Sequence, residues 1–218
     1  MLGKTHLFYG VTAGAVVVLA LAHPTRPLPL LEGALTGAFG GLLPDLDEPG
    51  STISNLPRIL GKMARRRLRQ ATRGAALALP GMLIGALIGL LAAALNVVSR
   101  ALSHLVRLVA GGHREGSHWL PIWAGLSVAA YLLTAVYAGP WPAAGFAAGY
   151  LSHLAGDGCT KSGIPLVPRT AARLHLLPRP LRIRTGSFGE TLFTVFYAVA
   201  LVAVIAVMRQ HGVTAVRP

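Results

Sequence analysis

Long runs of apolar residues with almost no charge are the feature that most limits what this chain can fold into. The runs at 75–98, 119–138 and 188–208 have the roughly 20 residues that a helix needs to cross the hydrocarbon core of a bilayer. Three shorter apolar runs lie at 7–22, 30–43 and 141–156. Charged residues make up only 12% of the chain, which is about half their share in soluble domains. The chain is therefore predicted to be a membrane protein.

A membrane environment restricts the fold, because only helices and closed barrels satisfy every backbone hydrogen bond in lipid. The alternation of apolar and polar residues that is typical of a transmembrane barrel is absent from the sequence. We therefore predict one all-α, polytopic domain over residues 1–218, with about five spanning helices. Within it, residues 55–110 are expected to form a basic interfacial helix and an apolar insertion.

The basic stretch 55–73 has the spacing of an amphipathic helix. Apolar residues such as Leu56, Ile59 and Met63 can share one face, and cations occupy the rest of the surface. Such a helix is predicted to lie in the membrane interface. A second interfacial helix is predicted at 97–110, where apolar and polar residues also recur at helical intervals.

Basic residues are in large excess, with 20 Lys and Arg against 7 Asp and Glu and a net charge of +13. One interpretation is a membrane anchor that binds nucleic acid through residues 58–73. Cations also accumulate on cytoplasmic loops, where they contact anionic lipid headgroups. We therefore favour membrane lipids over nucleic acid as the partner of these basic segments.

The polar segments of the chain are expected to meet on one face of the membrane. That requires the intervening residues 75–110 to cross the bilayer an even number of times. Residues 75–96 are therefore predicted to dip in and return, or to form a tight hairpin, helped by Gly81, Gly85 and Gly89. Most Lys and Arg then lie on the same side as the polar segments, which identifies that side as cytoplasmic.

The few acidic residues are concentrated rather than scattered. Five of the seven lie in the short polar segments PDLDEPGS (44–51), HREGSH (113–118) and HLAGDG (153–158), which also contain three of the eight histidines. Histidine and carboxylate side chains are the common ligands of zinc where cysteine is absent. A chain that keeps its rare carboxylates beside histidines is predicted to bind a metal.

Two pairs of residues carry this prediction. His153 and Asp157 are four residues apart on an apolar helix, so they share a face and can share a metal. Alternatively, His153 only packs and Asp157 only begins a turn. Asp45 and Asp47 follow Pro44 and project to the same side of an extended chain. There they can bridge metal ions, or they can belong to a solvated turn.

The remaining candidates have weaker individual signals. His118 begins an apolar helix, His113 precedes it in a loop, and His6 lies on the first turn of the first helix. Glu190 opens the last helix, where a carboxylate also serves as a helix cap. Each of these residues has a structural alternative in packing, capping or a solvated loop. Arg114 is suited to clamp a phosphate or carboxylate.

The residue types limit the metal and the chemistry. The lone cysteine, Cys159, excludes an intramolecular disulfide and a cysteine-based zinc site. The sequence has no glycine-rich phosphate loop with its lysine, no His-Glu-x-x-His and no Gly-x-Ser-x-Gly. A mixed set of His and Asp suits Zn²⁺, with Mn²⁺ or Fe²⁺ as alternatives. Such a site can activate water and polarise a phosphoryl or acyl oxygen.

Several short motifs occur in order along most of the chain. They are Thr5-His6, Gly41-Leu42-Leu43-Pro44-Asp45-Leu46-Asp47, His113-Arg114 with Ser117-His118, Gly149-Tyr150-Leu151-Ser152-His153 with Asp157, Thr160, Gly163-Ile164-Pro165-Leu166, and Gly186-Ser187 with Glu190. With these motifs the chain resembles the YdjM-like, inner-membrane-associated metal-dependent hydrolases of bacteria. It departs from that pattern at Glu115, where the family usually has glycine, and in the long apolar insertion at 75–110.

The resemblance implies a multi-pass protein of the bacterial cytoplasmic membrane with a metal-dependent hydrolase site. The family is distantly similar to zinc-dependent phospholipase C and the S1/P1 nucleases, which are all-helical and cleave phosphoesters with a zinc cluster. On that similarity the site would hold between one and three ions, most simply Zn²⁺. The implied ligands are His6, Asp45, His118, His153 and Asp157, followed by His113, Asp47 and Glu190.

Our leading hypothesis is a membrane-embedded hydrolase that cleaves a phosphoester in a lipid-like substrate at the cytoplasmic face. Asp47 or Asp157 would orient or deprotonate the attacking water, and Arg114 would hold the phosphate. The alternative is a non-enzymatic membrane protein that binds or transports metal ions. The gathering of polar groups at one face disfavours a path for transport across the bilayer.

Overall fold

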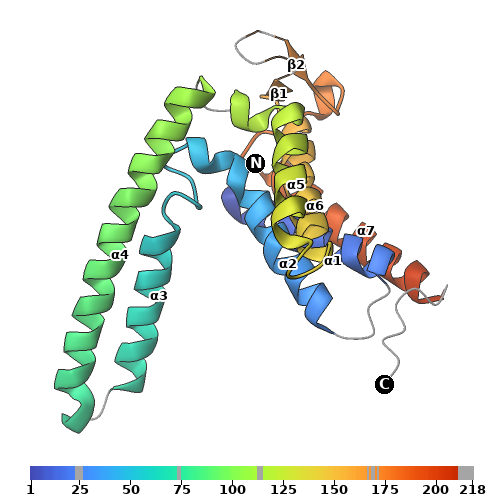
Figure 1. The fold of residues 1–218 in the computed structure, drawn as a ribbon. Helices are drawn as coiled ribbons and strands as arrows, with labels where there is room; N and C mark the ends of the chain where they lie inside the picture. The colour runs from blue at the N-terminus through green and yellow to red at the C-terminus, as the bar shows by residue number, and fades with distance from the viewer. Residues whose placement is uncertain are drawn as a thin grey trace. The chain divides into compact units, whose positions relative to one another are not determined.

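The computed structural model of the chain describes residues 1–22, 27–72, 75–111, 115–165, 167, 170 and 172–210. These residues form seven α-helices, three short 3-10 helices and one antiparallel pair of two-residue strands, which confirms the predicted all-α class (Figure 1). The α-helices are α1 (Gly3–Ala22), α2 (Pro27–Leu42), α3 (Leu56–Ala71), α4 (Ala75–Ala110), α5 (Leu120–Thr134), α6 (Trp141–Gly158) and α7 (Phe188–Gln210). The short elements are η1 (Leu43–Asp47), η2 (Gly116–His118), η3 (Arg179–Leu181), β1 (Ile164–Pro165) and β2 (Arg173–Leu174).

The chain divides into two compact units. The first consists of Met1–Pro44 and His113–Pro218, and the second of Asp45–Gly112. The predicted basic helix and apolar insertion at 55–110 lie entirely in the second unit.

The first unit is built around close contact of α1, α2 and α6. Glycines line these contacts at four-residue intervals: Gly10 and Gly14 on α1, Gly33, Gly37 and Gly41 on α2, and Gly145 and Gly149 on α6. A Cβ atom at Gly37 would lie 2.8 Å from Gly14 Cα, and one at Gly149 would lie 2.7 Å from Gly37 Cα. Because there is no room for a methyl group, the three helices touch through their backbones, as small residues allow in membrane helices.

Three described helices are long and apolar enough to cross a membrane, namely Gly3–Ala22, Leu79–Leu108 and Phe188–Met208. The expected span at 119–138 is shorter than its apolar run, because α5 has only 15 residues. At about 1.5 Å per residue it extends about 23 Å, which is less than the hydrocarbon thickness of about 30 Å. The membrane-spanning character is therefore supported by three helices, and the number of five stays a prediction.

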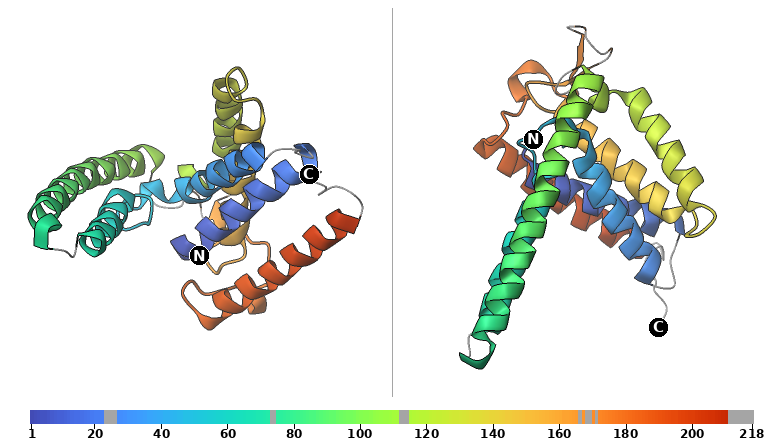
Figure 2. Two further views of the ribbon diagram at one scale, coloured as in Figure 1. Left: turned by 90° about the horizontal axis from the view of Figure 1, so that it is seen from below. Right: turned by 60° about the vertical axis from the view of Figure 1, so that its left-hand side comes forward.

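The second unit is an antiparallel pair of helices, α3 and α4, which lie side by side in each view (Figures 1 and 2). The predicted dip and return within 75–96 is wrong for this structure, since α4 is one continuous helix from Ala75 to Ala110. It also includes the separate interfacial helix that was predicted at 97–110. The physical reason is that alanine and leucine favour an uninterrupted helix.

The glycines that were expected to permit a hairpin within 75–96 instead receive side chains of α3. The nearest atoms to a Cβ at Gly81, Gly85 and Gly89 belong to Thr72, Leu68 and Arg65, respectively. The chain therefore reverses between α3 and α4 rather than within α4.

The two ends of the second unit meet at the base of this helix pair. The Ser103 hydroxyl donates a hydrogen bond to the Leu46 carbonyl, and Ser54 Oγ lies 2.5 Å from Ser103 Oγ. Near these residues, Arg107 Nη1 and Glu48 Oε2 form an exposed ion pair of 3.5 Å. An exposed pair of this kind contributes little to stability, so the buried serine bonds are the stronger link. The unit thus begins and ends at one place, and the even number of membrane crossings stays a prediction.

The backbone contacts of the first unit can be tested at Gly37. We expect Gly37→Ala to lower the free energy of unfolding by about 1–3 kcal/mol, because the added methyl group collides with α1. The measurement is thermal unfolding in detergent, followed by circular dichroism. Gly125→Ala is the matched control, since a Cβ at Gly125 meets nothing within 4 Å. Equal unfolding temperatures for the two variants would contradict the packing argument.

Candidate metal centre

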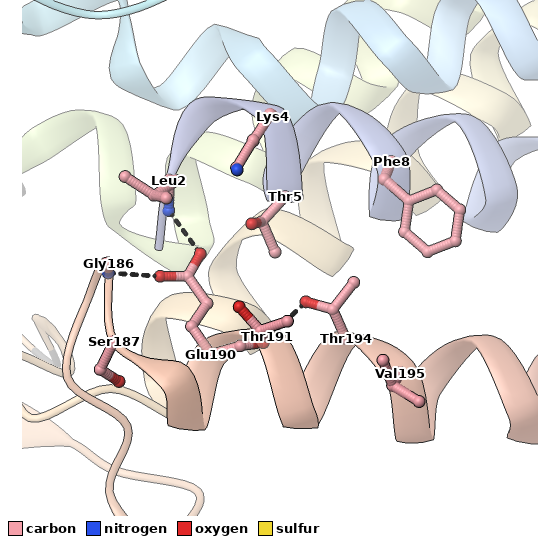
Figure 3. A pocket seen from close by; sticks show the side chains of 10 residues that line it. All are labelled: Leu2, Lys4, Thr5, Phe8, Gly186, Ser187, Glu190, Thr191, Thr194 and Val195. Carbon is pink, nitrogen blue, oxygen red and sulfur yellow. Dashed lines mark hydrogen bonds between the residues drawn. The ribbon is translucent and has the colours of Figure 1, made fainter.

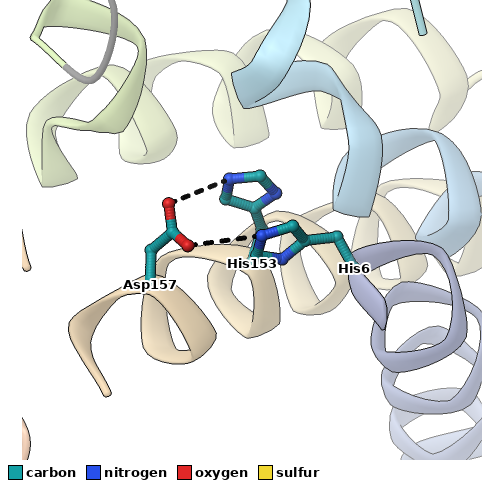
Figure 4. A group of neighbouring side chains, drawn as sticks. All are labelled: His6, His153 and Asp157. Atoms are coloured by element: carbon teal, nitrogen blue, oxygen red, sulfur yellow. Dashed lines mark ion pairs between the residues drawn. The ribbon is translucent and has the colours of Figure 1, made fainter. Parts of the chain in front are cut away.

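Three histidines and one aspartate form a buried cluster in the first unit. His6 comes from α1, His118 from η2, and His153 and Asp157 from α6. All four side chains are fully inaccessible to solvent. Figure 4 shows three of them, with both His6 and His153 facing the Asp157 carboxylate.

The glycine contacts bring α1 and α6 into position for this cluster. A Cβ at Gly41 would lie 2.7 Å from the His6 carbonyl oxygen, so the end of α2 lies against the first turns of α1. On α6, the four-residue interval places His153 and Asp157 on the same face, as predicted. The shared face of this helix therefore points toward His6.

Other contacts hold His118 in place. The Tyr150 hydroxyl donates a hydrogen bond of 2.5 Å to the Ser117 carbonyl, which fixes η2 against α6. Arg173 Nη2 lies 2.7 Å from Glu115 Oε1, so Glu115 joins the start of η2 to β2. Both contacts fix the backbone immediately before His118.

The ring and carboxylate atoms converge at distances that suit a metal ion. Asp157 Oδ1 lies 3.3 Å from His6 Nε2, and Asp157 Oδ2 lies 3.5 Å from His118 Nε2 and 3.8 Å from His153 Nε2. The Nε2 atoms of His118 and His153 are 3.1 Å apart. Ligands about 2.0–2.1 Å from a tetrahedral Zn²⁺ are separated by about 3.3 Å. The ligand atoms therefore have the spacing of a zinc site.

Hydrogen bonds orient the histidine rings toward one another. His153 Nδ1 donates a 2.8 Å hydrogen bond to the Gly41 carbonyl, so its Nε2 atom carries the lone pair. A histidine that binds a metal commonly uses its other nitrogen in this way. Since His118 Nε2 faces this lone pair, either a proton on His118 or a cation must lie between the two nitrogens.

His6 is the least satisfied member of the cluster. Its ring stacks on that of His153, with a centroid distance of 3.6 Å. Both ring nitrogens of His6 are buried, and neither has the geometry of a hydrogen bond to the described residues, although Nε2 forms the 3.3 Å ion pair with Asp157 Oδ1. An unsatisfied buried polar group costs about 1–3 kcal/mol. A metal ligand role for His6 would remove this cost.

The environment sets the charge of the two residues from α6. Burial lowers the pKa of His153 well below its ordinary value, and the neighbouring His6 acts in the same direction. Burial alone would raise the pKa of Asp157, but the close His118 and His6 rings hold it well below its ordinary value. At neutral pH the cluster therefore has a neutral His153 and an ionised Asp157, which are the forms that bind metal. The amino nitrogen of Met1, 2.5 Å from Asp157 Oδ1, also contributes positive charge.

Glu190 acts as a helix cap, which was the alternative to its predicted role as a metal ligand. Its carboxylate accepts hydrogen bonds of 2.7 Å from the backbone N–H groups of Leu2 and Gly186 (Figure 3). These bonds join the start of α1 to the turn that precedes α7. The metal-capable group in this unit consists of His6, His153 and Asp157, with His118 in contact with two of them.

The roles that the sequence predicts for the other site residues stay predictions. Asp45 and Asp47 lie in η1 and belong to the second unit, so their role as ligands stays a prediction. His113 and Arg114 lie outside the described residues. Three contributors to the site were missed from the sequence, namely the Gly41 carbonyl, the Tyr150 hydroxyl and the Met1 amino group. The interval Tyr150-x-x-His153 is a signal for the second, because it places both side chains on one part of α6.

The fold and the cluster define an all-helical membrane protein with a buried site of histidine and aspartate that can hold a metal ion. A family model for YdjM inner membrane proteins matches residues 1–212. The chain therefore belongs to the YdjM inner membrane protein family. No curated protein and no solved structure matches it.

The metal capacity of the cluster can be tested by removing its ligands. We expect the purified protein to retain a divalent metal, and His153→Ala or Asp157→Asn to weaken metal binding by about tenfold or more. The measurement is metal content by inductively coupled plasma mass spectrometry after equilibration with limiting Zn²⁺. His104→Ala is the control, because His104 is exposed and lies in the second unit. Unchanged zinc content in both cluster variants would contradict the assignment.

The structural role of Glu190 gives a separate prediction. Glu190→Gln should lower the stability by about 1–3 kcal/mol, because the amide nitrogen would face a backbone N–H that has lost its acceptor. Thermal unfolding of the full chain measures this loss. Glu32→Gln makes the same charge change on α2 and should have a smaller effect. A Glu190 variant that is as stable as the Glu32 variant would argue against the capping role.

Proposed function

We propose that this protein is a membrane-embedded, metal-dependent hydrolase that cleaves a phosphoester. The observation that carries this proposal is the convergence of His6, His118, His153 and Asp157 in one buried site. Nitrogen and carboxylate ligands without a thiolate suit Zn²⁺ best, with Mn²⁺ or Fe²⁺ as alternatives. A divalent ion bound there would polarise a phosphoryl oxygen and lower the pKa of a water molecule.

The chain's own residues supply the remaining parts of the proposed reaction. The ionised Asp157 carboxylate, held among three imidazoles, can accept a proton or orient the attacking water. Neutral His153, fixed by the Gly41 carbonyl, keeps one nitrogen directed at the site. The proposal also keeps two roles that were predicted from the sequence. Asp47 is an alternative base, and Arg114 holds the phosphate.

A lipid-like substrate is supported by the position of the site on helix α1. His6 lies on this candidate span, and a cavity of about 330 Å³ opens between the first turns of α1 and α7 (Figure 3). Lys4 and Ser187 line its polar part, and Phe8 and Val195 line its apolar part. A cavity with these two parts suits a phosphorylated headgroup joined to an acyl chain.

The cytoplasmic location of the site is supported by charge. In the first unit, cations gather in the segments that adjoin the start of α1, the end of α6 and the start of α7. They are Lys4, Lys161, Arg173, Arg179, Arg182 and Arg184. By the positive-inside rule, this side of the membrane is cytoplasmic.

A second candidate function is a non-enzymatic metal-binding membrane protein. It is favoured by the complete burial of the four side chains, since structural metal sites are closed whereas catalytic sites keep an open position. The two candidates differ in one outcome, because only the hydrolase converts a substrate when the metal is bound.

The test is turnover of defined phospholipids by the purified chain. We expect release of a phosphorylated headgroup from phosphatidylglycerol or phosphatidylethanolamine, or of inorganic phosphate from phosphatidic acid, detected by mass spectrometry. Removal of the metal by a chelator, or the change Asp157→Asn, should lower the rate by about 100-fold or more, because the activated water is lost. His104→Ala should keep the wild-type rate. Stoichiometric metal without turnover of any of these lipids would favour the non-enzymatic function.

A further inference from the structure

The second unit contains a basic cavity that the proposed hydrolase site does not use. It has a volume of about 410 Å³ and lies between α3 and α4, within the range of about 300–1,000 Å³ that is typical of ligand sites. Arg65, Arg69 and Thr72 line it from α3. Gly81, Met82, Gly85 and Ala86 line it from α4.

The two arginines of this cavity have no acidic partner on either helix. Residues 49–114 contain no Asp or Glu. The exposed pair of Glu48 and Arg107 lies at the opposite end of the helix pair, and no ion pair of Arg65 or Arg69 occurs within the part of the chain that is described. Like charges at an interval of four residues on a helix repel each other. An anion that binds both guanidinium groups would convert this repulsion into attraction.

The backbone of α4 makes room for one of these groups. A Cβ at Gly89 would lie 2.8 Å from Arg65 Nη1, so the guanidinium rests against the helix where a side chain is missing. Planar guanidinium groups bind phosphate oxygens in pairs of hydrogen bonds. The Thr72 hydroxyl already donates to the Leu68 carbonyl, so the two arginines are the donors available for an anion.

The surroundings of the cavity favour a lipid as the source of that anion. Next to it on α4, Met82, Leu83 and Leu87 are 71%, 66% and 66% exposed. The basic helix α3 cannot enter hydrocarbon at low cost, which keeps its cations at the level of the headgroups. A lipid can therefore place its phosphate between the arginines and its acyl chains along the exposed leucines.

We infer that the cavity between α3 and α4 is a binding site for the phosphate headgroup of an anionic membrane phospholipid. This site is independent of the metal centre, because it uses none of that centre's residues and lies in the other unit. It accounts for a basic helix that the hydrolase proposal leaves without a role.

The experiment measures lipid retention by the full-length protein in neutral detergent. Native mass spectrometry compares bound phosphatidylglycerol with bound phosphatidylcholine at equal added concentrations. The test variant is Arg65→Gln/Arg69→Gln. The matched control is Arg66→Gln/Arg67→Gln, which removes the same charge from exposed positions that do not line the cavity.

We expect the wild-type protein to retain phosphatidylglycerol in preference to phosphatidylcholine. The test variant should lose about tenfold in this preference, and the control variant less than about twofold. Gly89→Ala should also reduce the preference without changing any charge, because its methyl group displaces Arg65. This single-residue variant keeps the test decisive if the double variant fails to fold.

Four results would overturn the inference. An equal loss in both double variants would indicate diffuse surface charge rather than a site. The absence of any preference for phosphatidylglycerol would exclude an anionic lipid. Displacement of the lipid by inorganic phosphate at millimolar concentration would identify a free anion as the occupant. Binding of a short DNA duplex that requires Arg65 and Arg69, with lipid retention unchanged, would identify nucleic acid.

Discussion

Direct contact between helix backbones is the interaction on which the first unit depends. Glycines at four-residue intervals remove the side chains that would separate α1, α2 and α6. In a membrane, where apolar side chains gain little from leaving lipid, such close packing is a main source of helix association. The same contacts place His6 beside His153 and the Gly41 carbonyl within hydrogen-bond distance of His153 Nδ1. The fold and the candidate site therefore share one physical basis.

The buried cluster contains a carboxylate, and the groups around it offset the cost of removing that charge from water. A carboxylate without access to water is costly unless positive charge and hydrogen bonds surround it. Three imidazoles and the Met1 amino group lie around Asp157. A divalent cation would meet the same requirement and would also give one ring nitrogen of His6 a partner. The buried Asp157 carboxylate thus requires positive charge nearby, whether the cluster has a structural or a catalytic use.

The second unit has an excess of positive charge, in contrast to the buried carboxylate of the first unit. Its helices carry many cations and no acid lies between Glu48 and Glu115, so apart from the exposed pair of Arg107 and Glu48 their charge is left for other partners to balance. Glycines of α4 lie against Thr72, Leu68 and Arg65, which brings the Arg65 cation onto an apolar part of α4. Amphipathic pairs of this kind are stable at the boundary between headgroups and hydrocarbon. The long apolar insertion is therefore one side of a basic helix pair rather than an isolated re-entrant segment.

The sequence alone determined the all-helical membrane class, the face shared by His153 and Asp157, and the histidine and aspartate character of the site, because these follow from hydrophobic length and helical periodicity. It did not determine where the chain reverses in 55–110, since an apolar run with glycines suits a hairpin and a packed straight helix equally. Only the tertiary structure decided that His6 and His118 meet Asp157 whereas Glu190 caps the start of α1. Contacts between residues far apart in the sequence depend on which helix faces pack together, and local patterns carry no information about that choice.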